Sequence, residues 1–235
     1  MKALTAIIAI CFAFSATAQI SSAEKQALID FFHSTNGTEW NTVWDLEKPE
    51  NTWWGVEIKN NTVVGIELGF NNLQGELPAS IGDLKNLESL KLFFNQIGGS
   101  LPNELFTLKN LKTLDLNSNL ITGSIPSSIG ELNKLEALLL SSNNLTGMLP
   151  SEIGSLNELK TLVIFDNHFF GDFPLAISSL ENLNEVVIAR NNFNSESLKT
   201  SVAQIISNGA TVDFDEIKTH SQNSEFAILV MDDEN

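Results

Sequence analysis

Cysteine is almost absent from this 235-residue sequence, which contains Cys11 alone. Cys11 lies in an apolar N-terminal segment that we expect to be removed, so the mature chain would contain no cysteine. Secreted domains often use disulfides as cross-links, and this one would have none available. The absence also excludes a thiol nucleophile and a cysteine-based metal site. The hydrophobic core alone must therefore hold the fold together.

Basic residues are also scarce. The sequence has 13 Lys and Arg residues against 29 Asp and Glu residues, for a formal net charge of −16. Such a surface repels nucleic acid and anionic membranes, because affinity for nucleic acid rests on Lys and Arg meeting phosphates. A cationic partner, or a neutral one such as a peptide or glycan, is electrostatically easier. Hydrophobic residues make up 43% of the chain, so a sizeable core is expected.

Long hydrophobic runs are missing beyond the N-terminus, so no membrane span is expected. The first residues have the pattern of a signal peptide: Lys2, an apolar run over residues 6–14, and Ala16-Thr17-Ala18 as a cleavage site before Gln19. This pattern predicts a secreted protein, or one in the periplasm or at the cell surface. A buried N-terminal helix is the alternative. A lipid anchor on Cys11 is disfavoured because Ile10 is too large for the usual motif.

No recognisable catalytic, metal or phosphate motif is present. The three histidines, His33, His168 and His220, fall in separate segments of the chain. The acidic residues are dispersed except for Asp232-Asp233-Glu234, a pattern more typical of an acidic tail than of a calcium loop. We therefore expect no enzyme activity, no cofactor and no metal site.

An internal repeat dominates the rest of the chain. Asparagine, glycine and proline each recur with a step of 24 residues. The asparagines are Asn71, Asn95, Asn119, Asn143, Asn167 and Asn191, the glycines are Gly75, Gly99, Gly123, Gly147 and Gly171, and the prolines are Pro78, Pro102, Pro126, Pro150 and Pro174. One unit reads Leu108-x-x-Leu111-x-x-Leu114-x-Leu116-x-x-Asn119-x-Ile121-x-Gly123-x-Ile125-Pro126-x-x-Ile129-x-x-Leu132.

The physical chemistry of this unit predicts a stack of short strands. Leu114 and Leu116 alternate with Asp115, as in a strand with one buried face. The repeated asparagine follows each strand, where its amide can satisfy backbone groups that would otherwise be buried unpaired. We therefore interpret the six asparagines as a structural ladder. The Gly and Pro positions suit the returning chain, and stacked neighbours bury what no single repeat can bury alone.

This unit resembles the leucine-rich repeat, specifically the plant-type subclass found in plant receptor ectodomains and in many secreted bacterial proteins. The resemblance covers roughly residues 63–193, with almost no gaps or insertions. It implies an α/β solenoid with a parallel concave β-sheet, an irregular or 3-10 convex side, and helical N- and C-terminal caps. It also implies a protein that binds other molecules, although that step is an analogy at the level of the fold.

Both ends of the repeat array show cap patterns. Upstream, Ser21-x-x-Glu24 predicts a helix N-terminus, and Asn36-Gly37 predicts its end. A tryptophan-rich stretch follows and ends in Trp54-Gly55-Val56. It resembles the N-terminal cap of plant-type repeats but lacks that cap's cysteine pair, which points to a bacterial-type version. The four tryptophans of this stretch, Trp40, Trp44, Trp53 and Trp54, could form a sugar platform, but sealing of the first rung is the favoured interpretation.

Downstream, residues 196–207 have helical spacing, Asn208-Gly209 ends that helix, and residues 211–215 alternate like one more strand. An apolar run over residues 226–231 lies between acidic residues. The resulting division is a signal peptide at 1–18, an N-terminal cap at 19–62, repeats at 63–193, a C-terminal cap at 194–216 and an acidic tail at 217–235.

The solvent-facing strand positions of such repeats lie six, four, two and one residues before each asparagine. Each of these positions, followed from repeat to repeat, forms a column of side chains on the concave surface. The columns hold several apolar residues where polar ones are usual, and contiguous apolar patches mark interaction sites. Phe70, Phe93 and Phe94 should lie about one strand spacing apart, near 5 Å. The candidate ligand-binding residues are Phe70, Lys91, Phe93, Phe94, Asp115, Asn117, Leu139, Ser141, Val163, Phe165, Asp166 and Arg190. Coverage of these residues by a cap or the tail is the alternative interpretation.

Together these features predict an extracytoplasmic, non-catalytic recognition module that binds a protein or peptide on its concave face, as a monomer. A structural or adhesive cell-surface protein is one alternative, and a glycan-binding or inhibitor protein is another. Ice binding is a further activity of similar repeats, but it needs a flat, regular Thr or Asn array, and the columns here are irregular.

Overall fold

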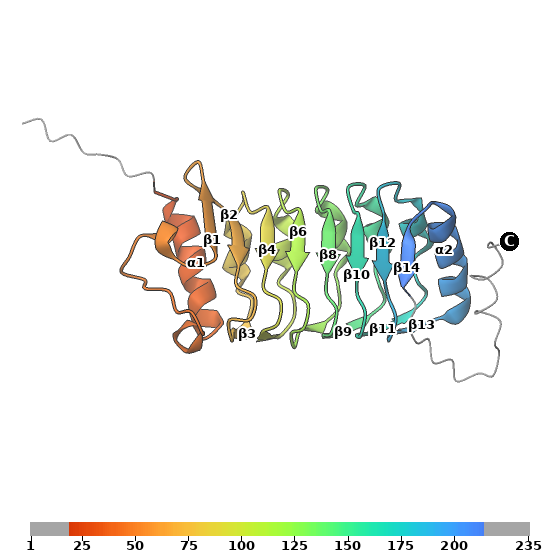
Figure 1. Ribbon diagram of the computed structural model, residues 1–235, viewed down its shortest axis with the longest axis horizontal. Coiled ribbons are helices and arrows are strands. Elements are labelled where there is room, and N and C mark those ends of the chain that lie inside the picture. Colours follow the sequence, from red (N-terminus) through yellow and green to blue (C-terminus); the bar gives the residue numbers. More distant parts are fainter. Residues whose placement is uncertain (1–18, 214–235) are drawn as a thin grey trace, which may run out of the picture.

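The computed structural model describes residues 19–213, which form an elongated solenoid (Figure 1). The expected signal peptide, residues 214–216 of the expected C-terminal cap and the acidic tail lie outside the described residues. No helix within residues 19–213 is long and apolar enough to cross a membrane.

The N-terminal cap begins with helix α1, Ser22–Ser34. The predicted capping box is present, because the Ser21 hydroxyl accepts from the Glu24 backbone N–H while the Glu24 carboxylate accepts from Ser21 N–H. Glu24 also accepts from Val63 N–H at 3.0 Å, which ties the helix to the first repeat strand. Short 3-10 helices follow at Gly37–Glu39 and Glu50–Thr52.

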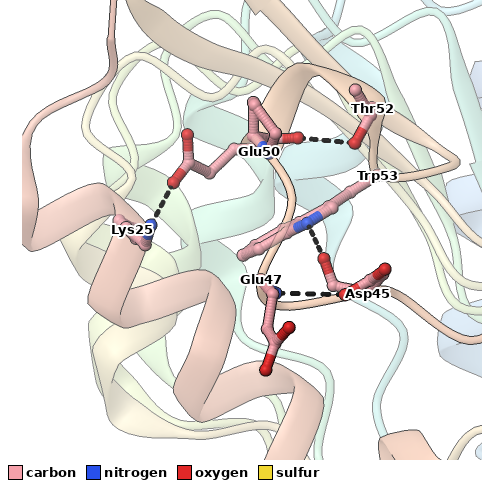
Figure 2. A network of polar contacts seen from close by, with 7 residues as sticks. Lys25, Asp45, Glu47, Glu50, Thr52 and Trp53 are labelled. Carbon is pink, nitrogen blue, oxygen red and sulfur yellow. Dashed lines mark hydrogen bonds and ion pairs between the residues drawn. The ribbon is translucent and has the colours of Figure 1, made fainter.

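Aromatic residues fill the space between α1 and the first rung. Phe31, Phe32, Trp40, Trp44 and Trp53 are buried, and the Trp44 and Trp53 rings stack with centroids 5.0 Å apart. The loop that presents Trp53 is fixed by polar contacts (Figure 2): Trp53 Nε1 donates to the Asp45 carbonyl, and Lys25 Nζ pairs with the buried Glu50 carboxylate at 2.6 Å. The cap thus seals the core without disulfides.

A single eight-stranded sheet lines the concave side (Figure 1). Its first strand pairs antiparallel with the second, and all later pairs are parallel. Paired residues are 24 positions apart within the repeat array, and 26 positions apart where the last strand joins the sheet. The strands, in spatial order, are β1 (Val56–Lys59), β2 (Thr62–Glu67), β4 (Ser89–Lys91), β6 (Thr113–Asp115), β8 (Ala137–Leu139), β10 (Thr161–Val163), β12 (Glu185–Val187) and β14 (Thr211–Asp213). The constant register within the repeat array follows from the constant repeat length.

The opposite side carries one five-residue 3-10 helix per repeat, as expected. Each begins directly after the repeated proline, which is the N-cap residue and has an extended backbone. These helices span Ala79–Asp83, Asn103–Thr107, Ser127–Glu131, Ser151–Ser155 and Leu175–Ser179.

Short strands between the asparagine and the proline were not predicted from the sequence. They pair as β3 (Gln74–Glu76) with β5 (Gln96–Gly98), and as a second sheet of β7 (Thr122–Gly123), β9 (Asn144–Gly147), β11 (His168–Gly171) and β13 (Asn192–Phe193). The paired residues are 22 positions apart, so the pairing is two residues out of step with the 24-residue repeat. The strands form because these segments of adjacent rungs run side by side, so their backbone polar groups can pair although the side chains do not alternate in a strand-like pattern.

The core runs as one cluster from the cap to the last rung. The leucines on either side of each exposed strand position are buried, as Leu114 and Leu116 illustrate on either side of Asp115. At the far end, helix α2 (Ser195–Ser207) begins at Asn194, whose side chain accepts from Glu196 N–H. Buried Leu198, Val202 and Ile205 of α2 cover the last rung, and β14 adds one more strand beside β12.

Candidate functional site

The repeated asparagines form a buried ladder at the end of each concave strand. Asn119 is typical. Its Oδ1 accepts from Ile97 N–H of the preceding rung at 3.0 Å, while its Nδ2 donates to the carbonyls of Leu92 and Leu116 at 2.9 and 3.1 Å. Asn71, at the start of the row, instead binds both backbone groups of Thr42 in the cap. The ladder thus fixes the turn from which the candidate binding residues project.

The residue before each asparagine has an unusual backbone. All six have φ between 52° and 59°, in the left-handed region. Non-glycine residues adopt this conformation at a cost of about 1–2 kcal/mol, so the hydrogen bonds of the ladder must hold it. Sequence analysis did not predict this feature. The six residues are Phe70, Phe94, Ser118, Ser142, Asp166 and Arg190.

Three phenylalanine rings form an exposed cluster at the N-terminal end of this surface, which we call the Phe cluster (Phe70, Phe93, Phe94). The Phe70 and Phe94 rings stack at 4.5 Å between centroids, and Phe93 lies edge-on to Phe70 at 5.4 Å. Phe70 is 62% exposed and Phe94 is 53% exposed. The Phe93 ring lies over Gly69, where a Cβ atom would come within 2.5 Å of it. The expected proximity of these rings is confirmed.

A second apolar group lies further along the sheet. Leu139, Val163 and Val187 are directly opposite one another on β8, β10 and β12, and all are half-buried. Phe165 lies beside them, with the Arg190 guanidinium 5.1 Å from its ring centroid. A cation over an aromatic face is attractive, so Arg190 shields this part of the surface and makes it less open than the Phe cluster.

The predicted polar stretch between the two apolar groups is tied into the backbone. The Asp115 carboxylate accepts from Asn117 N–H at 3.1 Å, and the Asn117 side-chain oxygen accepts from Ser141 N–H at 2.7 Å. Burial raises the pKa of Asp115, against the lowering effect of the Asn117 N–H and of Lys91. Ser141 was expected to face solvent, but it is only 9% exposed because it lies beneath these neighbours.

Paired charges run along the edge where the concave strands begin. Glu88 pairs with Lys112, and Glu136 pairs with Lys160, each at 2.6 Å. The hydrogen bonds from these lysines are the main reason that the pKa values of Glu88 and Glu136 are lowered. All four side chains are solvent-exposed, so the pairs align neighbouring rungs but contribute little stability.

One exposed tryptophan was not singled out from the sequence. The expected sealing role is confirmed for Trp40, Trp44 and Trp53, whereas Trp54 is 49% exposed. Trp54 lines a pocket of about 430 Å³ where the cap meets the first concave strands. A sequence pattern cannot separate Trp54 from Trp53, because the two are adjacent and only the fold decides which one turns outward.

Within residues 19–213, no group of three or more His, Cys, Asp or Glu side chains is arranged to hold a metal ion. His33 lies in α1 and His168 lies in β11 near the other end of the array, while His220 lies outside the described residues.

Comparisons with known proteins agree with this architecture. Two family models described as leucine-rich repeat match residues 86–108 and 99–145. No curated protein matches the chain. Among solved structures, the leucine-rich-repeat ectodomain of the receptor kinase SOBIR1 from Arabidopsis thaliana is similar, with a TM-score of 0.65 and 26% identity over 74% of this chain and 96% of that one.

Two other similar structures are larger than this chain. One is the ectodomain of the Arabidopsis receptor kinase HAESA in complex with an IDA peptide hormone ligand, with a TM-score of 0.71 and 28% identity. The match covers 81% of this chain and 32% of the HAESA ectodomain. A plant ice-binding protein has a TM-score of 0.65 and 28% identity over 74% of this chain, which spans 58% of it. The repeat geometry and these matches show the fold, an α/β leucine-rich-repeat solenoid with a parallel concave sheet.

Proposed function

We propose that this protein is an extracytoplasmic, non-catalytic recognition module that binds an extended peptide or protein segment on its concave face. The observation that carries the proposal is the Phe cluster. Exposed aromatic rings that already stack on one another lose little conformational freedom when a partner covers them, which favours their use as binding anchors.

The second apolar group and the polar stretch extend this surface along the sheet. A ligand lying across the strands would meet the Phe cluster first, then Asp115 and Asn117, and then Leu139, Val163 and Val187. The HAESA structure, which holds a peptide hormone, supports a peptide as the class of ligand. The similar plant ice-binding protein does not lead us to propose ice binding for this chain. Ice binding needs a regular array of side chains, whereas the positions two residues before each asparagine hold residues as different as Gly69, Phe93 and Asn117.

We further propose that the chain is a secreted, plant-type repeat of the kind that lacks cysteines in its cap. The signal-peptide pattern of residues 1–18 supports secretion. The buried tryptophans Trp40, Trp44 and Trp53 support a cap that needs no disulfide, because they close the first rung by packing alone.

The proposal is tested by selecting random linear peptides displayed on phage against the secreted protein and against two double variants. Phe70→Ser/Phe94→Ser removes the exposed anchors, whereas the control Leu120→Ser/Met148→Ser removes two exposed apolar side chains outside the concave columns. Circular dichroism and thermal unfolding verify that each variant is folded.

We expect the wild type and the control to enrich the same peptides, and the Phe variant to bind them at least about tenfold more weakly. Equal binding by the Phe variant would move the site elsewhere. Failure of the wild type to enrich any peptide would refute peptide recognition, and concentration-dependent self-association in sedimentation would then favour an adhesive role.

A further inference from the structure

The pocket beside Trp54 is formed by the first three strands of the concave sheet. Glu57 of β1 lies opposite Gly65 of β2, and Gly65 lies opposite Ser89 of β4. In the next row, Glu67 of β2 lies opposite Lys91 of β4. These side chains and Trp54 surround a space of about 430 Å³, a size within the range of small-molecule sites.

The floor of the pocket exists because Gly65 has no side chain. Glu57 and Ser89 stand on either side of it, so a gap opens between them. A Cβ atom at Gly65 would come within 3.1 Å of the Glu57 carboxylate and 3.2 Å of Glu57 Cβ, so even one methyl group would crowd this space. No other repeat has both a glycine at this strand position and a tryptophan beside it.

The charges around the pocket are balanced. Glu67 pairs with Lys91 at 3.2 Å, and Glu57 pairs with Lys59 at 2.7 Å. A cationic ligand would have to displace a lysine from a carboxylate that already has a partner. A neutral ligand need not, because carboxylate oxygens have further lone pairs and a lysine amine has further N–H groups that can bond a hydroxyl.

We propose that this pocket binds one neutral sugar unit of a glycan. The apolar face of a sugar ring packs against an exposed indole, while its hydroxyl groups both donate and accept hydrogen bonds. Trp54 supplies the indole, Glu57 and Glu67 accept from hydroxyls, and Lys91 and Ser89 donate to them. None of the three Phe-cluster residues lines this pocket, although Lys91 is also one of the candidate concave-face residues. The inference therefore goes beyond the proposed peptide binding and does not depend on it.

The experiment follows the four tryptophan indole N–H signals of the full secreted chain by NMR during titration with three neutral sugars. The probes are methyl β-glucoside, methyl α-mannoside and N-acetylglucosamine, with arginine amide as a cationic comparison. We expect at least one sugar to shift the Trp54 indole signal saturably, with a dissociation constant on the order of 1 mM. The signals of the buried Trp40, Trp44 and Trp53 should move little.

Two variants examine the pocket itself. Trp54→Ala removes the indole, and Gly65→Ala places a methyl group on the floor; each should weaken sugar binding by about tenfold or more. The matched control is Phe170→Ala, which removes a ring of similar exposure (46%) from β11 and should leave binding unchanged. Thermal unfolding verifies that the variants are folded.

The proposal is overturned if none of the three sugars shifts the Trp54 signal. It is also overturned if arginine amide shifts that signal and the sugars do not, since the pocket would then select a cationic peptide side chain. Sugar binding that survives both pocket variants but is lost in Phe70→Ser/Phe94→Ser would place the sugar on the Phe cluster and refute this site.

Discussion

Replacing Asn119 with alanine should destabilise the protein by an amount that the hydrogen bonds of the ladder allow us to estimate. The Asn119 amide donates to the carbonyls of Leu92, Leu116 and Asn117, and accepts from Ile97 N–H. Each of the three carbonyls also accepts from a second donor, either another ladder asparagine or the backbone. The alanine variant therefore orphans one buried group, the Ile97 N–H.

An orphaned buried N–H costs about 1–3 kcal/mol. The variant also loses the hydrogen bonds that the Asn119 side-chain amide donates to backbone carbonyls. Because each of these carbonyls keeps one other partner, this loss adds only about 1 kcal/mol. We therefore expect Asn119→Ala to lower the free energy of unfolding by about 2–4 kcal/mol. Loss of the Asn119 hydrogen bonds also frees the left-handed backbone of Ser118. Both effects should be local to this rung.

Asn119→Asp separates the acceptor role of the side chain from its donor role. The carboxylate can still accept from Ile97 N–H, but it faces three carbonyl oxygens and cannot donate to them. Burial and these oxygens raise the pKa of the new carboxyl in the folded state above its value in the unfolded chain. The penalty is therefore full above the folded-state pKa, and it disappears as pH falls below the unfolded-state value near 4.

The assay is urea unfolding of wild type, Asn119→Ala and Asn119→Asp at pH 7 and at about pH 4. The control is Asn144→Asp, since Asn144 is exposed one position after a ladder asparagine and should change stability little. A loss below about 1 kcal/mol for Asn119→Ala, or an Asn119→Asp penalty that does not diminish in acid, would refute this account of the ladder.

Two further predictions concern the cap. Lys25→Met should destabilise the protein by about 1 kcal/mol at neutral pH, a modest value because Lys25 is partly exposed to water. Burial acts to raise the pKa of Glu50, but the bond with Lys25 more than offsets it and holds the pKa below its ordinary 4.5. The Glu50 contribution is thus present above pH 4.5 and lost as pH falls through the folded-state value, so wild type and variant should converge in acid unfolding curves. Gly75→Ala should lower the free energy of unfolding by more than about 2 kcal/mol, as measured by thermal unfolding. Gly75 has φ of 109°, and a Cβ atom there would lie 2.1 Å from the Ser34 carbonyl oxygen. The control Gly209→Ala should cost less, because Gly209 has φ of 93° but open space around it.

The repeat length and its residue pattern determined the fold of this chain. A fixed step of 24 residues forces equivalent strands into one register, so the parallel sheet and the buried ladder could both be predicted. The irregular or 3-10 convex side was expected only from the resemblance to plant-type repeats. The capping box at Ser21 and the helix before Asn208 were equally local, because each depends on residues within one or two turns. The row of exposed positions before each asparagine also followed from this period.

The tertiary structure alone decided which of those positions are open. Ser141 is buried and Phe165 is shielded by Arg190, because the neighbouring rungs cover them. The pocket beside Trp54 depends on β1, an antiparallel strand from the cap that no repeat pattern predicts. Exposure and pockets arise where segments distant in sequence meet, and a periodic pattern describes only what each segment shares with its equivalents.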